Sequence, residues 1–112
     1  MELEILNTKL KTELTVDLFH KLVSQLQKDF VLTGIQYDFS DLDPNQLINS
    51  LNEIMEELLN KEYPTLLNLL YRMDIPESAI NFNDEITAEQ HLVNLILRRE
   101  FLKIQLRMKY SS

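Results

Sequence analysis

The stretch TAEQHLVNLILRREFLKIQLRMKY, residues 87–110, predicts one long helix on which the rest of the chain must pack. Thr87 and Gln90 have the spacing of a capping box, in which both side chains satisfy free backbone N–H groups at a helix start. No Gly or Pro follows, so the helix can extend for about 35 Å at about 1.5 Å per residue. Its turns align one apolar stripe, made of Val93, Leu97, Phe101, Ile104 and Met108. Only a narrow solvent-facing strip is expected, with Asn94, Arg98, Gln105 and Lys109.

A second apolar row on the same helix is the candidate partner interface. Its leucines follow heptad a and d spacing, with an arginine at the intervening a position, and the row consists of Leu92, Leu95, Arg99, Leu102 and Leu106. A helix that is apolar on two sides needs neighbours on both. Two coverings stay open: the helix over residues 64–73 of the same chain, or a second subunit or partner protein. In the second case, Arg99 would bond an acid across the interface or extend its charged end to water.

The composition predicts an all-α fold, a compact bundle of about four helices with the long C-terminal helix as its hub. The 112 residues fit one helical domain, residues 1–112, and a hydrophobic content of 45% suffices for one core. One Gly and three Pro provide little turn chemistry for a sheet with many hairpins. The chain contains no Cys, which excludes disulfides and thiolate chemistry.

The four main helices are expected near residues 15–31, 44–61, 64–73 and 87–110. Thr15 can cap the first helix and Gly34 can end it. Asp43, followed by a proline, is a strong start for the second. Residues 1–14 fit a helix or a strand, whereas residues 35–42 are expected to form a buried connector rather than a sheet.

The break between the second and third helices is expected at a proline. Tyr63 precedes Pro64, and a residue before proline is disfavoured in α geometry. The helix over residues 44–61 should therefore stop near Lys61. The helix that follows is apolar nearly all round, which predicts that it is buried or covered by another subunit.

The net charge of −7 is unevenly distributed, with +3 over residues 88–112 and −10 over residues 1–87. This pattern indicates a basic helix docked on an acidic body, with bases near a helix C-terminus where its dipole favours them. The N-terminus lacks the basic and apolar regions of a secretory signal. No run approaches the ~20 apolar residues that span a bilayer. These features predict a cytoplasmic protein.

The acidic residues do not form a recognisable metal site. Asp41, Asp43 and Asn45 match the opening of a calcium loop, but Gln46 and Asn52 stand where that loop needs Gly and Glu. Capping of the following helix explains these residues better.

The histidines and serines do not form a recognisable catalytic motif. Asp17 and His20 have the spacing of half a di-iron site, but His91 has no acid at the equivalent place. Two solvated surface histidines are expected instead. With one Gly, the chain has no phosphate-binding loop and no nucleophile elbow. We expect no catalytic, cofactor-binding or metal site.

Two segments carry a resemblance: LLNLLYRMDIPE, residues 66–77, and LILRRE, residues 95–100. Together they resemble an uncharacterised family of short, helical bacterial proteins. The resemblance implies a helical fold and a bacterial cytoplasmic setting, and it brings no activity with it.

The leading hypothesis is a small non-catalytic protein that acts as a protein–protein interaction module or as a homo-oligomeric structural protein, such as a homodimer. One alternative is a small-molecule or enzymatic site in a cavity between helices, with Tyr71, Arg72 and His91 as candidates. A second alternative is nucleic-acid binding through the last helix, whose bases Arg98, Arg99, Lys103 and Arg107 can contact phosphates. The acidic net charge argues against nucleic acid.

Overall fold

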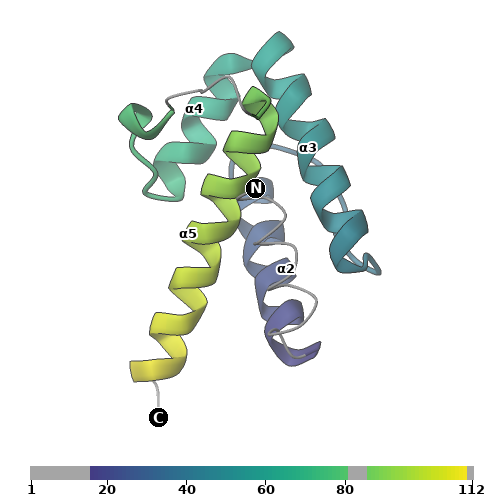
Figure 1. Cartoon of the computed structure of the whole chain (residues 1–112), viewed down its shortest axis with the longest axis vertical. Helices are drawn as coiled ribbons and strands as arrows, with labels where there is room; N and C mark the ends of the chain where they lie inside the picture. Colours follow the sequence, from purple (N-terminus) through teal and green to yellow (C-terminus); the bar gives the residue numbers. More distant parts are fainter. Residues whose placement is uncertain (1–15, 81–85, 111–112) are drawn as a thin grey trace.

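The computed structural model describes residues 16–80 and 86–110. These residues form an all-α bundle without a strand, as predicted (Figure 1). Its elements are α2 (Val16–Leu32), α3 (Pro44–Lys61), α4 (Tyr63–Arg72), the 3₁₀ turn η1 (Glu77–Ala79) and α5 (Ala88–Tyr110). In these residues no helix is long and apolar enough to cross a membrane. The predictions for residues 1–14 and for the Thr15 cap lie outside the described residues.

Two helices begin with capping boxes; the sequence analysis predicted the box at Thr87, and for Asp43 it predicted the N-cap alone. Asp43 accepts a hydrogen bond from the backbone N–H of Gln46 at 2.8 Å, and the Gln46 side chain accepts one from the Asp43 N–H at 2.9 Å. Thr87 and Gln90 make the same reciprocal pair, each at 3.2 Å. These bonds satisfy backbone donors that have no partner inside a helix, and so they fix where α3 and α5 start.

Two helices end on a residue in the left-handed conformation. After α2 this is Gly34, with φ of 89°, and the Ile35 N–H bonds back to the Phe30 carbonyl at 2.9 Å. After α4 it is Asp74, with φ of 60°, and the next N–H bonds to the Leu70 carbonyl at the same distance. The sequence predicted the glycine ending. For the second it predicted an end near residue 73, before Pro76, but not the left-handed Asp74, because an Asp in this conformation is uncommon.

The junction of α3 and α4 differs from the prediction by one residue. α3 ends at Lys61, as expected, but α4 begins at Tyr63, before Pro64. The chain breaks at Glu62 alone, whose φ and ψ are −141° and 55°. The proline occupies the first turn of α4, where its missing N–H is tolerated.

α5 packs against both α2 and α3, and α4 packs against α3 and α2 (Figure 1). Among the described residues, nineteen buried apolar side chains form the core between them, including Leu26, Leu51, Leu69 and Val93. The chain itself buries only one face of α4, because Tyr71 is 85% exposed. The alternative that another subunit covers this helix stays a prediction.

The segment between α2 and α3 is a connector without a strand, as predicted, but of residues 35–42 only Phe39 is buried. Gln27 holds it, donating to the Tyr37 carbonyl at 2.6 Å and accepting from the Phe39 N–H at 2.9 Å. Phe39 is fully buried and packs edge-to-face on Phe30, with ring centroids 5.0 Å apart. One side chain thus replaces the backbone pairing that a strand would need.

Two residues of α5 lie where the sequence pattern did not place them. Asn94, expected in solvent, is 1% exposed, and its amide atoms have no hydrogen-bond partner. Met108, expected in the apolar stripe, is 47% exposed. The two differences share a cause: near its start α5 is enclosed on most sides, whereas its last turns extend beyond the core.

Candidate interaction surface and buried acid pair

The leucine row of the candidate interface divides into a buried half and an exposed half. Leu92 is fully buried in the core, and Leu95 is partly buried against it. Leu102 and Leu106 are each 43% exposed. The row is therefore part of the core at its start, and only its second half is available on the surface. We call the exposed part, Leu102 and Leu106 with the adjoining basic residues, the α5 outer face.

The connector after α4, rather than α4 itself, is attached to this side of α5. Arg99 donates from Nε to the Met73 carbonyl at 3.0 Å, and its Nη2 lies 3.5 Å from Asp74 Oδ2. One hydrogen bond joins His91 Nε2 and the Ala79 carbonyl oxygen, 3.0 Å apart. His91 is thus half-buried and bonded, which corrects the expectation of a solvated surface histidine. Arg99 bonds within the chain.

Basic residues border the α5 outer face on both sides. At about 100° per residue, Arg98 and Lys109 fall on one side of the two leucines, and Arg99 and Lys103 fall on the other. Arg98 and Lys109 are exposed, whereas Arg99 and Lys103 are half-buried. Lys103 lies 3.3 Å from a carboxylate oxygen of Glu100 and is 18% exposed. The outer face is thus apolar along its middle and positively charged along its edges.

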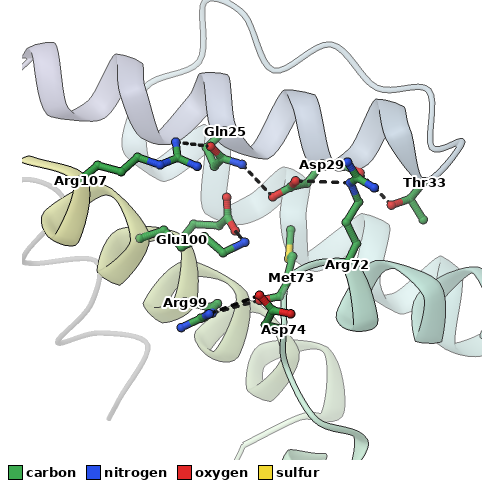
Figure 2. A network of polar contacts seen from close by, with 10 residues as sticks. Gln25, Asp29, Thr33, Arg72, Met73, Asp74, Arg99, Glu100 and Arg107 are labelled. Atoms are coloured by element: carbon green, nitrogen blue, oxygen red, sulfur yellow. Dashed lines mark hydrogen bonds and ion pairs between the residues drawn. The ribbon is translucent and has the colours of Figure 1, made fainter. Parts of the chain in front are cut away.

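Beneath α5, two acidic side chains are buried beside each other (Figure 2). Glu100 is fully buried, and Asp29 on α2 is 4% exposed. Burial, then the Asp29 charge, raise the pKa of the Glu100 carboxyl from 4.5 to about 7, against the opposing effect of Lys103. Apart from the ion pair with Lys103, neither Glu100 oxygen accepts a hydrogen bond of good geometry. A proton held by Glu100 can instead be shared with Asp29, which satisfies both groups.

Further polar contacts connect this acid pair to three helices. Gln25 donates to Asp29 Oδ2 at 3.2 Å and accepts from Arg107 Nη1 at 2.8 Å. Arg72 on α4 places its Nε 3.6 Å from Asp29 Oδ1. Figure 2 shows these side chains converging from α2, α4 and α5. The network therefore links helices that are distant in the sequence.

The sequence analysis did not identify the acid pair, although its spacing contained a signal. Glu100 lies three residues after Leu97 and four before Ile104, both of which are buried. Asp29 likewise lies three residues after Leu26. An acid at a core position of a helix is expected to be paired or protonated, and a facing pair of such acids marks a buried polar contact.

The residues of the catalytic alternative do not meet at one site. Tyr71 and Arg72 line an open groove of about 820 Å³ beside α4, together with Asp29, Asn68 and Asp74. His91 is bonded to Ala79 and does not line this groove. Among residues 16–80 and 86–110, no three His, Cys, Asp or Glu side chains are grouped to hold a metal ion.

Comparisons with protein-family models, with curated proteins and with solved structures give no match to this chain.

Proposed function

We propose that the protein is a non-catalytic protein–protein interaction module that binds its partner through the α5 outer face. The supporting observation is the 43% exposure of both Leu102 and Leu106, one turn apart on a helix whose first half is in the core. Fully burying a leucine is worth about 1.5–3 kcal/mol. Covering what remains exposed of these two would therefore contribute on the order of 1 kcal/mol each.

The charge around the leucines favours an acidic partner over a second copy of the chain. Of the five bases from residue 98 to residue 109, four border the two leucines, whereas Arg107 lies on the side of α5 that faces α2 and bonds Gln25; the four are Arg98, Arg99, Lys103 and Lys109. The one acid of this segment, Glu100, is buried. Two copies of the outer face would bring like charges together, which opposes association. We therefore infer a partner surface, such as an amphipathic helix, that carries apolar side chains between acidic ones.

The cellular setting of the proposal is the bacterial cytoplasm. It follows the resemblance of residues 66–77 and 95–100 to short helical bacterial proteins. Nucleic acid is a weaker candidate for the same basic residues. Arg99 and Lys103 already make contacts within the chain, and they would lose these on turning to phosphates.

Site-specific photo-crosslinking tests the proposal. A benzophenone amino acid is placed at Leu102 or Leu106, and at the exposed Glu53 of α3 as a matched control on another helix. In native lysate, we expect one discrete adduct from the two α5 positions and none from the α3 position. Adding Leu106→Glu to the Leu102 probe should remove the adduct while circular dichroism shows an unchanged helix content.

Three results would overturn the proposal. Adducts of equal yield at Glu53 would show non-specific contact, and the absence of any adduct at both α5 positions would exclude a partner there. A crosslink to the chain's own residues 1–15, in which Leu3, Leu6, Leu10 and Leu14 have helical spacing, would make the face an intrachain one. A crosslinked homodimer would keep the surface but replace the acidic partner with a second copy.

A further inference from the structure

A second surface lies between α2 and α5, at the end of the molecule where α2 begins and α5 ends. The two helices diverge there (Figure 1), and a groove of about 530 Å³ separates their side chains. Its lining from α2 is His20, Lys21, Ser24, Gln25 and Lys28, and from α5 it is Ile104, Arg107 and Met108. This groove is on the other side of α5 from Leu102 and Leu106, because residues two positions apart on a helix point about 200° apart. The inference is therefore independent of the proposed function.

The charge of the groove is opposite to that of the whole protein. The chain has a net charge of −7, yet the groove is lined by two lysines, an arginine and a histidine and by no carboxylate. Lys21 is paired with Asp17 outside the groove at 3.3 Å. Lys28 makes no ion pair within the described residues. An anion entering here would find a cation without a partner.

The bottom of the groove is fixed and partly apolar. Ile104 is 4% exposed and belongs to the core. Gln25 is 9% exposed and is held on both sides, by Arg107 and by Asp29. Met108 is 47% exposed and adds an adaptable apolar surface at the rim. The guanidinium of Arg107 is thus already oriented, which lowers the entropic cost of binding a ligand.

The size of the groove limits the size of the anion that can bind there. Its volume falls within the range of about 300–1,000 Å³ typical of small-molecule sites. From Lys21 to Lys28 the α2 wall extends about 10 Å, at about 1.5 Å per residue. That length accommodates one anionic group and a short apolar chain, whereas a nucleic-acid duplex or a partner helix needs a longer surface.

We propose that this groove binds a small organic anion whose phosphate or carboxylate group contacts Lys28 and Arg107 and whose apolar part lies on Ile104 and Met108. Both head groups accept charge-assisted hydrogen bonds from ammonium and guanidinium groups. An arginine can in addition bind either of them through two nitrogens at once.

The test is a titration of the ¹⁵N-labelled full chain with four probes, followed by amide chemical shifts. The three octyl compounds are kept below their micelle concentrations. Octyl phosphate and octanoate carry both parts of the ligand, inorganic phosphate carries only the charge, and octyl glucoside carries only the chain. We expect the amides of Ser24, Lys28 and Arg107 to shift. One of the two octyl anions should bind at least about tenfold more tightly than inorganic phosphate and octyl glucoside, since a tenfold change corresponds to about 1.4 kcal/mol. The tighter of the two identifies the head group.

Matched variants make the test specific. Lys28→Gln and Arg107→Gln should each weaken the octyl anion by about tenfold, as expected for loss of one charge-assisted contact. Lys61→Gln removes the same charge from the exposed end of α3 and should change affinity by less than about twofold, since a distant exposed charge is screened. Lys28 is exposed, so its substitution leaves the fold intact even if the Arg107 variant loosens α5.

Three results would overturn the inference. Equal weakening by Lys61→Gln would show a response to net charge alone. Equal binding of octyl glucoside would show a purely apolar surface. Displacement of the octyl anion by an equimolar single-stranded oligonucleotide would show that the bases serve nucleic acid.

Discussion

The two halves of α5, residues 88–97 and 98–110, contain six apolar residues each but are covered by the rest of the protein to different extents. Every residue from Ala88 to Leu97 is buried or partly buried, even the polar Asn94. From Arg98 onward, Leu102, Leu106 and Met108 are more than 40% exposed. A periodic apolar pattern therefore indicates that a helix has an apolar face, but the length of the neighbouring elements decides where along the helix that face is covered.

The largest difference in stability should come from replacing one leucine by alanine in each half of α5. Leu92→Ala removes a fully buried side chain, and we expect a loss of about 2–5 kcal/mol in the free energy of unfolding. Leu102→Ala should cost less than about 1 kcal/mol, because much of its side chain is already in water. Urea denaturation of both variants measures the difference. Equal losses would mean that Leu102 is also in the core.

The next effect concerns the boundary between the halves, where Glu100 is buried. Its pKa of about 7 in the folded protein exceeds the ordinary 4.5, so between these pH values the folded state binds more protons than the unfolded chain. Stability should therefore fall as pH rises from about 4.5 to about 7, by about 3 kcal/mol in total.

Glu100→Gln should remove this dependence and make the protein more stable than the wild type at pH 8. Urea denaturation from pH 4.5 to 8 measures both properties, with the exposed Glu53→Gln as a control that retains the wild-type slope. If Glu100→Gln kept that slope, another group would be responsible for it.

A smaller change in stability, this time a gain, is expected from a substitution in the first half of α5. Asn94 is 1% exposed with both amide atoms unpaired. Asn94→Leu has a similar shape and removes the desolvated polar group, so it should stabilise the protein by about 1–2 kcal/mol. Thermal denaturation would show a higher Tm. A lower Tm would indicate that the amide has a partner, such as a buried water.

The smallest difference in stability is expected at Asp74, in the connector after α4. Two substitutions there separate the effect of the backbone conformation from that of the side chain. Asp74 has φ of 60° and an exposed ion pair with Arg99 at 3.5 Å. Asp74→Gly and Asp74→Ala both lose the ion pair, but only Gly accepts this backbone conformation without strain. The Ala variant should therefore be less stable than the Gly variant by about 1 kcal/mol. Equal stabilities in urea denaturation would mean that the turn relaxes.

The parts of this fold that follow local rules could be predicted from the sequence. Asp43 and Thr87 each have the partner residue that a capping box needs, and Gly34 is the one residue suited to end α2. These features depend on residues within four positions of one another. They are therefore readable without knowledge of the tertiary structure.

The candidate site depends on contacts that local rules do not contain. The pairing of Glu100 with Asp29, and the attachment of Arg99 to Met73, join segments far apart in the chain. The sequence suggested the leucine row but could not show that Leu92 is covered and Leu106 is not. That distinction depends on how α5 packs against the other helices, which local sequence does not contain.

The bond between Gln25 and Arg107 joins residues 82 positions apart, and this separation has a consequence for the order of folding. α3 and α4 are neighbours in sequence and can pack early, because little chain entropy is lost in bringing them together. Docking of the second half of α5 on α2 closes the longest loop of the described chain, and we expect it to be formed late. The same contact should be the first to open in the native protein. Amide hydrogen exchange should then be faster in the last turns of α5 than in α3, and the anion groove and the outer face would both belong to the least protected part of the fold.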